Sequence, residues 1–594
     1  MHGRLKVKTT AEKEAEKKKE REKKKAIYQK CMNKIRGLFM SGDRSVVLLN
    51  LITKVLENIP EFGTLWNWRR IVLLEIFREC VEEKCNEDEL LAMKTTEKDN
   101  EVDKTPNKAD MIISEKLFVA RCLEVNPKAY SLWSHRRWLV EQDPSESVIK
   151  EELSLCNLFL KYDERNFHCW DYRRFIVTLG GIKTQSELEM STSLIERNFS
   201  NYSAWHYRTT LLDTENMGVV RDELEWTQNA YFTDPSDQSV WLYYQWLLGR
   251  EVQGDKVLAV YRDTDNSTIH VLINNLTYSP PSQLLIKRMS NTDENTDENK
   301  VQNTDENTDE NTDDNTANTV TWRSSTSPSR LWSCDISNFG GHVTITLGDS
   351  SVTLSDGATL GVDKEGISPL VKYTAPRDLV EEQLGNIREL YELEPDNKWV
   401  ILTYLDMVNT CNPHKSKEQI TEIRNLTVKL CHVDSMRTGF YRDLWTKLLC
   451  ETAVTAWWSN TSRDVIRSRD PLNLSKKYLT KLAHSDYMFA LHEVDLSHNN
   501  LTSLTGFSSL VAVEKLNLSN NKIHSLEGLE GCKNLKELDA SHNQIHNACG
   551  ILACTKCRLR ALHLVGNPLA ATSVYPACVV QSCSMLCTLD DREL

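Results

Sequence analysis

Residues 126–137 read NPKAYSLWSHRR, and residues 163–174 read DERNFHCWDYRR. In both stretches a tryptophan is followed at the third and fourth positions by two arginines. The residues are Trp133 with Arg136 and Arg137, and Trp170 with Arg173 and Arg174. Residues three and four apart lie on one face of a helix, and tryptophan is the best aromatic partner for a guanidinium. We therefore expect each block to be helical, with its tryptophan stacked against its own arginines.

The same block recurs along the chain, which makes it a structural repeat. The further copies are Trp66 with Arg69 and Arg70, Trp205 with Arg208, and a weaker copy at Trp241. The five tryptophans are separated by 67, 37, 35 and 36 residues. A spacing of 35 to 37 residues suits two helices and a turn, and the first spacing is one such unit plus an insertion. Because one unit cannot bury its apolar face alone, the sequence predicts stacked helix pairs, an α-α superhelix.

The residues before the tryptophans have the character of helix starts. Asn126 and Asp234 each stand seven residues before a tryptophan, and each is followed by a proline. Asparagine and aspartate cap helix N-termini with a side-chain oxygen, and proline is favoured at the first helical position. The sequence therefore predicts that the helices of these blocks begin at Asn126 and Asp234.

The helical pattern of residues 26–250, which follows a charged segment at 1–25, is interrupted after residue 250. Residues 251–370 contain short alternating stretches that predict half-buried strands, such as 267–273 and 343–347. We expect an inserted, immunoglobulin-like β-sandwich. The residues expected between its sheets are Trp322, Leu331 and Trp332. Its loop 291–318 repeats Asn-Thr-Asp-Glu and is acidic with almost no apolar side chains, so we expect disorder there.

Two further regions complete the chain. Helical periodicity returns in residues 371–470, where Trp399 marks a degenerate block. Residues 471–594 follow the leucine-rich pattern LxxLxLxxNxL. Its asparagines, Asn499, Asn521, Asn543 and Asn567, are spaced by 22, 22 and 24 residues. Asparagine amides repeated in this way predict a ladder that satisfies backbone groups where each strand turns into a loop.

Composition narrows the class of protein. A chain of 594 residues holds roughly three to five domains. The net charge of −13 argues against nucleic acid as the main partner. Seventeen cysteines without a secretory signal indicate reduced thiols and a cytoplasmic location. No apolar run approaches the roughly 18–20 residues of a transmembrane segment.

Repeated tryptophan-arginine blocks that follow an Asn/Asp-Pro turn resemble the α subunits of protein prenyltransferases. The resemblance covers about residues 55–250. With the inserted sandwich and the leucine-rich repeats, the chain is most similar to the α subunits of type II, or Rab, geranylgeranyltransferases. The resemblance implies an enzyme that is active as a heterodimer, in which the superhelix surrounds a β subunit that holds zinc and the lipid pocket. Such enzymes transfer geranylgeranyl from geranylgeranyl diphosphate to C-terminal cysteines of Rab GTPases, which an escort protein presents.

The resemblance also assigns candidate site residues. It places Lys128 and His168 beside the diphosphate as catalytic residues, and Tyr130 and Asn166 near them as substrate-binding residues. On spacing alone, a lysine in the first turn of a helix is usually only solvated. Because the β subunit holds the zinc, no metal site is expected in this chain, and His2 is its one candidate ligand to the partner's zinc.

Two alternatives remain open from the residues. The first is a non-enzymatic scaffold in which the superhelix and the leucine-rich repeats dock other proteins. The second is an α subunit of the farnesyltransferase and type I kind, which is similar over the tryptophan blocks but lacks both added regions. The sequence shows no nucleophile triad or phosphate-binding glycine loop.

Overall fold

The protein is described as a computed structural model that divides into two compact units, Met1–Val219 and Val220–Leu594. The described residues are 11–91, 108–249, 256–263, 265–277, 284–289, 322–324, 329–335, 342–347, 350–354, 360–362, 373, 375–412, 415–460, 471–547 and 557–594. His2 and the tandem loop 291–318 lie outside them.

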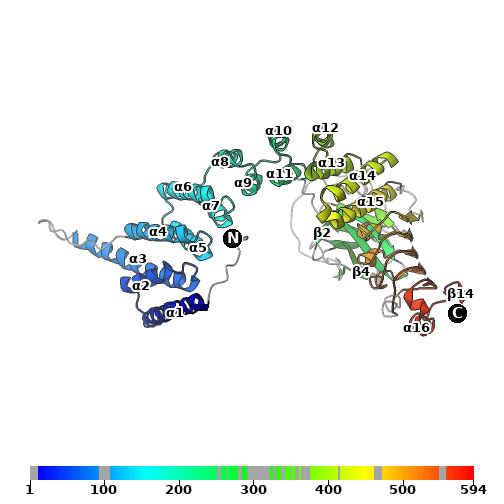
Figure 1. Cartoon of the computed structure of the whole chain (residues 1–594), viewed down its shortest axis with the longest axis horizontal. Helices are drawn as coiled ribbons and strands as arrows, with labels where there is room; N and C mark the ends of the chain where they lie inside the picture. Colours follow the sequence, from blue (N-terminus) through cyan, green and yellow to red (C-terminus); the bar gives the residue numbers. More distant parts are fainter. Residues whose placement is uncertain are drawn as a thin grey trace, which may run out of the picture. The chain divides into compact units, whose positions relative to one another are not determined.

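The first unit consists of helices that pair along the chain (Figure 1). They are α1 (Ala11–Met40), α2 (Val46–Leu56), α3 (Gly63–Leu91), α4 (Lys108–Val125), α5 (Tyr130–Gln142), α6 (Glu146–Tyr162), α7 (Phe167–Leu179), α8 (Thr184–Arg197) and α9 (Tyr202–Thr209). Each second helix of a pair begins three residues before the tryptophan of its block, as α5 and α7 illustrate. The period read from the sequence is therefore one helix pair, and the predicted helical repeat is confirmed.

The predicted helix starts are wrong by three or four residues. The side chains of Asn126 and Asp234 accept hydrogen bonds from the backbone N–H groups of Lys128 and Ser236, two residues later. They therefore stabilise the turn before each helix and do not cap the helix itself. The N-cap positions are three residues further on, at Ala129 and Asp237. Asparagine and aspartate favour both arrangements, so composition alone does not choose between them.

The block tryptophans form the interior of the helix pairs. Trp66, Trp133, Trp170, Trp205 and Trp241 are each at most 5% exposed. Every one of their indole N–H groups donates to the backbone carbonyl six residues earlier, at 2.8 or 2.9 Å. Each tryptophan therefore fixes the turn that precedes its own helix.

The second unit contains the remaining helices and the strands that the structure describes. Its helices are α11 (Gln238–Leu248), α12 (Arg377–Leu393), α13 (Lys398–Cys411), α14 (Lys417–Val433), η1 (Ser435–Arg437) and α15 (Thr438–Asn460), while α10 (Met217–Thr233) spans the division. Its first strands are β1 (Val257–Asp263), β2 (Thr268–Thr277), β3 (Leu285–Met289), β4 (Ser329–Asp335), β5 (His342–Leu347), β6 (Ser350–Leu354) and β7 (Leu360–Val362). The predicted strands at 267–273 and 343–347 are confirmed.

These strands form two sheets that share a core. Their orders are β4-β2-β1-β7 and β3-β5-β6. Trp332 lies between them and Trp322 packs against the same core, as predicted. Leu331 instead points to the opposite side and joins the core formed by α15 and the leucine-rich repeats. The order of the described strands does not reproduce the immunoglobulin order, in which the first two strands stand beside the fifth and fourth. The alternation of apolar and polar residues predicts where strands lie and which of their faces is buried. It does not predict which strands pair, because pairing depends on contacts between residues remote in sequence.

The leucine-rich repeats form a parallel ladder in the second unit (Figure 1). The strands are β8 (Leu472–Asn473), β9 (Glu493–Asp495), β10 (Lys515–Asn517), β11 (Glu537–Asp539), β12 (Ala561–His563) and β13 (Thr588–Leu589), with β14 (Arg592–Glu593) antiparallel at the end. The remaining elements are η2 (Ser485–Met488), η3 (Phe507–Ser509), η5 (Pro568–Ala571) and α16 (Ala577–Ser582). The Asn521 amide donates to the Leu496 and Leu518 carbonyls and accepts from the Leu501 N–H, so the predicted asparagine ladder is confirmed.

Candidate functional site

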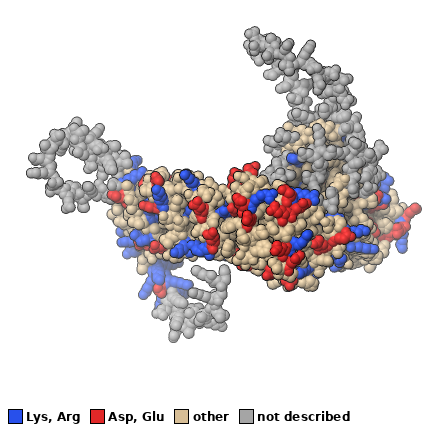
Figure 2. All heavy atoms as spheres, turned by 90° about the horizontal axis from the view of Figure 1, so that it is seen from above, with Lys and Arg blue, Asp and Glu red and all other residues tan. Residues whose placement is uncertain are grey.

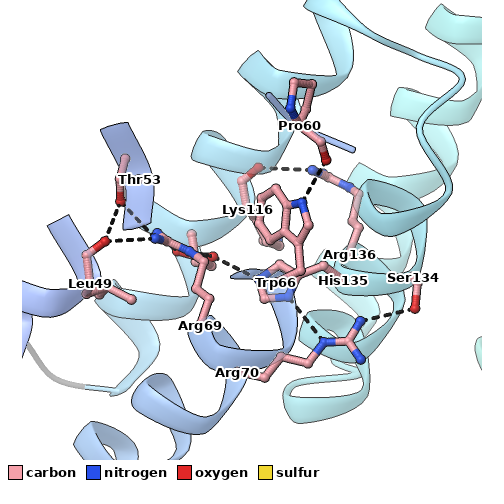
Figure 3. A network of polar contacts seen from close by, with 11 residues as sticks. Leu49, Thr53, Pro60, Trp66, Arg69, Arg70, Lys116, Ser134, His135 and Arg136 are labelled. Atoms are coloured by element: carbon pink, nitrogen blue, oxygen red, sulfur yellow. Dashed lines mark hydrogen bonds and ion pairs between the residues drawn. The ribbon is translucent and has the colours of Figure 1, made fainter. Parts of the chain in front are cut away.

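The first arginine of each block joins one repeat to the next (Figure 3). Arg69 on α3 donates through Nε and Nη2 to the two carboxylate oxygens of Glu115 on α4, at 2.5 and 2.6 Å. Its Nη1 donates to the Leu49 carbonyl and the Thr53 hydroxyl on α2. One buried guanidinium therefore fastens both helices of its own repeat to the following repeat.

We call this buried contact between an arginine and a glutamate of the next repeat a joint, and it recurs further along the first unit. Arg136 donates to both oxygens of Glu152 at 2.6 and 2.9 Å, and Arg173 to both oxygens of Glu187 at 2.7 Å. Each glutamate also contacts the residue two positions after the next tryptophan. These contacts are His135 Nε2 to Glu115 at 2.8 Å, Tyr172 Oη to Glu152 at 2.9 Å and Tyr207 Oη to Glu187 at 2.9 Å. Arg208 is also buried and binds the Leu188 carbonyl and the Ser191 and Thr192 hydroxyls.

The glutamates of these joints were not identified from the sequence, although a signal exists. Glu115, Glu152, Glu187 and Glu223 each stand 18 residues before the tryptophan of their repeat. Tyr243, two positions after Trp241, donates to Glu223 at 2.6 Å. Searching for one invariant acidic position per repeat, in addition to the tryptophan, identifies the joint.

Burial and pairing set the protonation of the first joint. Burial alone raises the pKa of Glu115, but hydrogen bonds from His135 and Arg69 outweigh it and lower that pKa to about 2. Burial lowers the pKa of His135 by more than Glu115 raises it. Glu115 is therefore ionised and His135 neutral at neutral pH, and the charge of Glu115 is balanced by Arg69.

The predicted stacking of each tryptophan on its own arginines is wrong for the joints that the structure describes. The Arg69 guanidinium lies over Phe118, 4.5 Å from the ring centroid. Trp66, Trp133 and Trp170 instead pack against the next repeat. The ring-centroid distances are 4.6 Å for Trp66–His135, 5.3 Å for Trp133–Tyr172 and 5.2 Å for Trp170–Tyr207. Buried glutamates on the neighbouring repeat hold the guanidinium groups, and local spacing does not reveal these partners.

The candidate site residues from the sequence gather where α5 and α7 begin. The Lys128 side chain is 68% exposed, and its ammonium lies 3.1 Å from Asp163 Oδ2. The Tyr130 ring is 4.2 Å from the His168 ring, edge to face, and Phe167 lies against both. The structure thus brings a lysine, a histidine and exposed aromatic rings together from two consecutive repeats.

Asn166 has a structural position within this cluster. It is 1% exposed and forms the N-cap of α7, where its Oδ1 accepts from the backbone N–H groups of His168 and Cys169. Its Nδ2 donates to the Pro127 carbonyl at 3.1 Å. Pro127 also accepts the Trp133 indole, so the Asn166 amide fixes the α5 turn relative to α7.

His168 is held in its neutral form. Its side chain is buried against Tyr130 and Phe167, and burial lowers its pKa more than Asp171 and a hydrogen bond to the Lys128 backbone raise it. The nearby charge of Lys128 lowers that pKa further. A neutral imidazole has a single N–H, and here it donates to the Lys128 backbone, so the positive charge of the cluster comes from Lys128.

Sequence reasoning missed Phe167 and the pairing role of Asp163. Phe167 is 58% exposed and belongs to a series of aromatic residues three positions before the tryptophan. The others are Tyr130 and Tyr202, which are 71% and 47% exposed. Exposed apolar rings that gather into one patch are typical of surfaces that a partner covers. Within the described residues no group of three histidine, cysteine, aspartate or glutamate side chains is placed to hold a metal ion.

Comparisons of the sequence with protein families and with known relatives agree with this architecture. The model of the protein prenyltransferase alpha subunit repeat matches residues 114–143, 149–179, 184–215 and 220–251, and that of the leucine rich repeat matches 489–545. The chain is 33% identical to the geranylgeranyl transferase type-2 subunit alpha of Homo sapiens over 529 residues, and 32% identical to that of Sus scrofa over 528 residues. Each comparison covers 83% of both chains. The solved Candida albicans protein geranylgeranyltransferase-I complexed with GGPP is 13% identical, with a TM-score of 0.40 over 71% of this chain and 91% of that one.

Proposed function

This chain belongs to the family of geranylgeranyl transferase type-2 alpha subunits, and from that membership we propose its role in catalysis. It is the non-zinc subunit of a heterodimer that transfers geranylgeranyl from geranylgeranyl diphosphate to C-terminal cysteines of Rab GTPases. An escort protein presents the Rab substrate, and the reaction takes place in the cytoplasm. No helix among the described residues has the length and hydropathy needed to cross a membrane.

The proposal assigns the metal to the partner. Zinc bound by the β subunit would hold the acceptor cysteine as a thiolate, ready to attack the first carbon of the prenyl chain. As that bond forms, the bond from the same carbon to the diphosphate breaks, and negative charge grows on the leaving oxygen. Fixed cations and hydrogen-bond donors beside that oxygen lower the barrier.

The cluster at the starts of α5 and α7 supports a role in binding the leaving diphosphate. The Lys128 side chain is mostly exposed, and its ammonium pairs with the partly exposed Asp163. Such an exposed ion pair is worth about 0–1 kcal/mol, so Lys128 can exchange Asp163 for a diphosphate at little cost. His168 is buried and oriented by the Tyr130 and Phe167 rings, so that its imidazole position is fixed before an anion arrives. Lys128 thus supplies charge, and the single N–H of His168 donates to the diphosphate in exchange for its hydrogen bond to the Lys128 backbone.

The neighbouring residues shape the same edge. Exposed Tyr130 and Phe167 offer apolar surface to the β subunit, and Asn166 holds the two helix starts in register. The observation that carries the proposal is this convergence of an exchangeable lysine, a positioned histidine and exposed rings at one edge of a prenyltransferase repeat. We also propose that His2, outside the described residues, contacts the partner's zinc.

Reconstitution tests the function directly. The chain is mixed with a type-2 β subunit, a Rab–escort complex and labelled geranylgeranyl diphosphate. We expect zinc-dependent transfer of label to Rab from the mixture of both subunits, and none from either subunit alone. A chain that forms no complex with the β subunit at micromolar concentration would favour the scaffold interpretation. Transfer to a CaaX substrate in place of Rab would favour a farnesyltransferase or type I subunit.

A further inference from the structure

The second arginine of each block does not form the arginine–glutamate pair of its joint, and its position changes along the repeats. Arg70 donates from Nε to His135 Nδ1 at 3.3 Å and from Nη2 to Ser134 Oγ at 3.1 Å (Figure 3). The Arg70 guanidinium lies 5.8 Å from the centroid of Trp138, and the Arg137 guanidinium lies 4.1 Å from that of Phe175. Both rings stand five residues after the tryptophan of the following repeat. The corresponding position after Trp205 is Thr210, so Arg174 faces no ring there.

Arg174 and Arg137 open onto one hollow between α5 and α7. Its volume is about 340 Å³, and its walls are Arg137, Asp171, Arg174, Phe175, Thr178 and Leu179. Arg174 is 3.6 Å from Asp171, and Arg137 is 3.8 Å from Glu141. Both separations exceed hydrogen-bond length, and the two arginine side chains are 43% and 51% exposed. Their guanidinium groups are therefore available to another ligand.

The chemistry of the walls selects the kind of ligand. Each guanidinium group has one carboxylate beside it, Glu141 for Arg137 and Asp171 for Arg174, and neither pair is within hydrogen-bond length. Each group can therefore bind a further carboxylate through paired hydrogen bonds. Phe175 and Leu179 add apolar surface beside them. On the face seen in Figure 2, acidic and basic residues are interspersed. A carboxylate would therefore be attracted by the nearby guanidinium groups and not by a large positive surface. An acidic side chain followed by an apolar one fits this hollow.

The arginines of the hollow lie on the same helix faces as the exposed aromatic rings described above. Arg137 follows Tyr130 by seven residues, and Arg174 follows Phe167 by seven. Seven residues are close to two turns, so each arginine lies on the same helix face as its aromatic residue, about 10 Å along the helix. A protein that covers the aromatic rings of α5 and α7 therefore reaches both arginines.

We propose that this hollow docks an acidic side chain of the β subunit, with an apolar neighbour against Phe175 and Leu179. The inference rests on the proposed function, because it identifies the β subunit as the occupant. It explains why the blocks at Arg137 and Arg174 carry two arginines: the first closes the joint, and the second binds the partner.

The test is the dissociation constant of the complex between the full chain and a type-2 β subunit, measured by titration calorimetry. Arg174→Glu should weaken binding by about tenfold or more, which is about 1.4 kcal/mol. Arg174→Lys should weaken it less, because the charge remains but paired hydrogen bonds are lost. The matched control is Lys150→Glu on α6, an exposed cation outside the hollow, which should change binding less than twofold. The difference between wild type and Arg174→Glu should shrink at high salt.

The outcomes separate the two proposals. If the unaltered chain does not bind the β subunit, the proposed function fails. If it binds and Arg174→Glu binds as tightly, with an unchanged melting temperature, only the docking hollow is overturned. Binding of inorganic diphosphate to the chain alone that is lost in Arg174→Glu, with unchanged affinity for the β subunit, overturns it in favour of a small anion.

Discussion

The joints between helix pairs differ between the two units. In the first unit each joint is a buried ion pair, such as Arg173 with Glu187. In the second unit the arginine position is held by Tyr244, whose hydroxyl lies 3.1 Å from Gln383 Oε1 on α12. The same fold therefore accepts a charged joint and a neutral one. A buried charge that loses its partner is costly, whereas a neutral group that loses one hydrogen bond costs far less.

The comparison also corrects the register of the degenerate block. Asn397 caps α13, and the cap precedes the block tryptophan by four residues elsewhere, for example Asn166 before Trp170. The tryptophan position is thus Ile401, and Trp399, predicted from the sequence to mark the block, is two residues too early. Gln383 stands 18 residues before Ile401, the spacing of the joint glutamates.

Removing one ion of a charged joint should have the largest effect. Arg173→Ala leaves Glu187 buried without its cation, and we expect the free energy of unfolding to fall by about 3–5 kcal/mol. Hydrogen exchange of the α7 and α8 amides, read by mass spectrometry, measures this locally. The double variant Arg173→Ala with Glu187→Ala should recover part of the loss, because no unpaired charge remains. Equal losses in the single and double variants would contradict the charged-joint account.

One buried glutamate in each unit, Glu115 and Glu451, should also respond to pH, and the two effects have opposite signs. The pKa of Glu115 is lowered from 4.5 to about 2, so its stabilisation is present above pH 4.5 and is lost as pH falls towards 2. Burial on α15 raises the pKa of Glu451 from 4.5 to about 7, against a hydrogen bond from Asn409. The stabilisation by protonated Glu451 is present below pH 4.5 and is lost as the pH rises to 7. At about 1.4 kcal/mol per pH unit, each effect is on the order of 3 kcal/mol.

Local hydrogen exchange between pH 3 and pH 8 checks both slopes. Glu451→Gln should remove the pH dependence of α15 above pH 4.5 and leave that of α4 unchanged. An unaltered slope at α15 in this variant would show that another group titrates there.

The neutral joint should show a smaller effect. Tyr244→Phe removes one hydrogen bond to Gln383 and leaves the ring in place, so we expect a loss of about 1 kcal/mol. Urea unfolding of the full chain, followed by exchange at α11 and α12, measures it. A loss as large as that of Arg173→Ala would remove the distinction between the two kinds of joint.

The same comparison explains what the sequence predicts well. The tryptophans and the leucine-rich asparagines recur at nearly constant spacings, so the helix pairs and the parallel ladder were predicted from them. Arg69 and Glu115 are 46 residues apart, and rules based on neighbouring turns of one helix do not connect them. Lys128 and His168 were identified by resemblance, and the structure brings them to one edge. Their contact with Tyr130, Phe167 and Asp163 depends on the stacking of two repeats.

Lys128→Ala should have the smallest effect on stability of these substitutions and the largest effect on catalysis. Lys128 is exposed, and its pair with Asp163 contributes about 0–1 kcal/mol. Lys128→Ala should therefore fold and bind the β subunit normally. Its charge is proposed to act on the leaving diphosphate, where loss of one stabilising group costs about 10²-fold in turnover.

The most direct test is the single-turnover rate of geranylgeranyl transfer by the heterodimer that contains Lys128→Ala. Melting temperature and heterodimer affinity are measured on the same sample. The account predicts a rate lower by about 10²-fold, with both other quantities unchanged. A rate equal to that of the unaltered heterodimer, at full heterodimer formation, would contradict it.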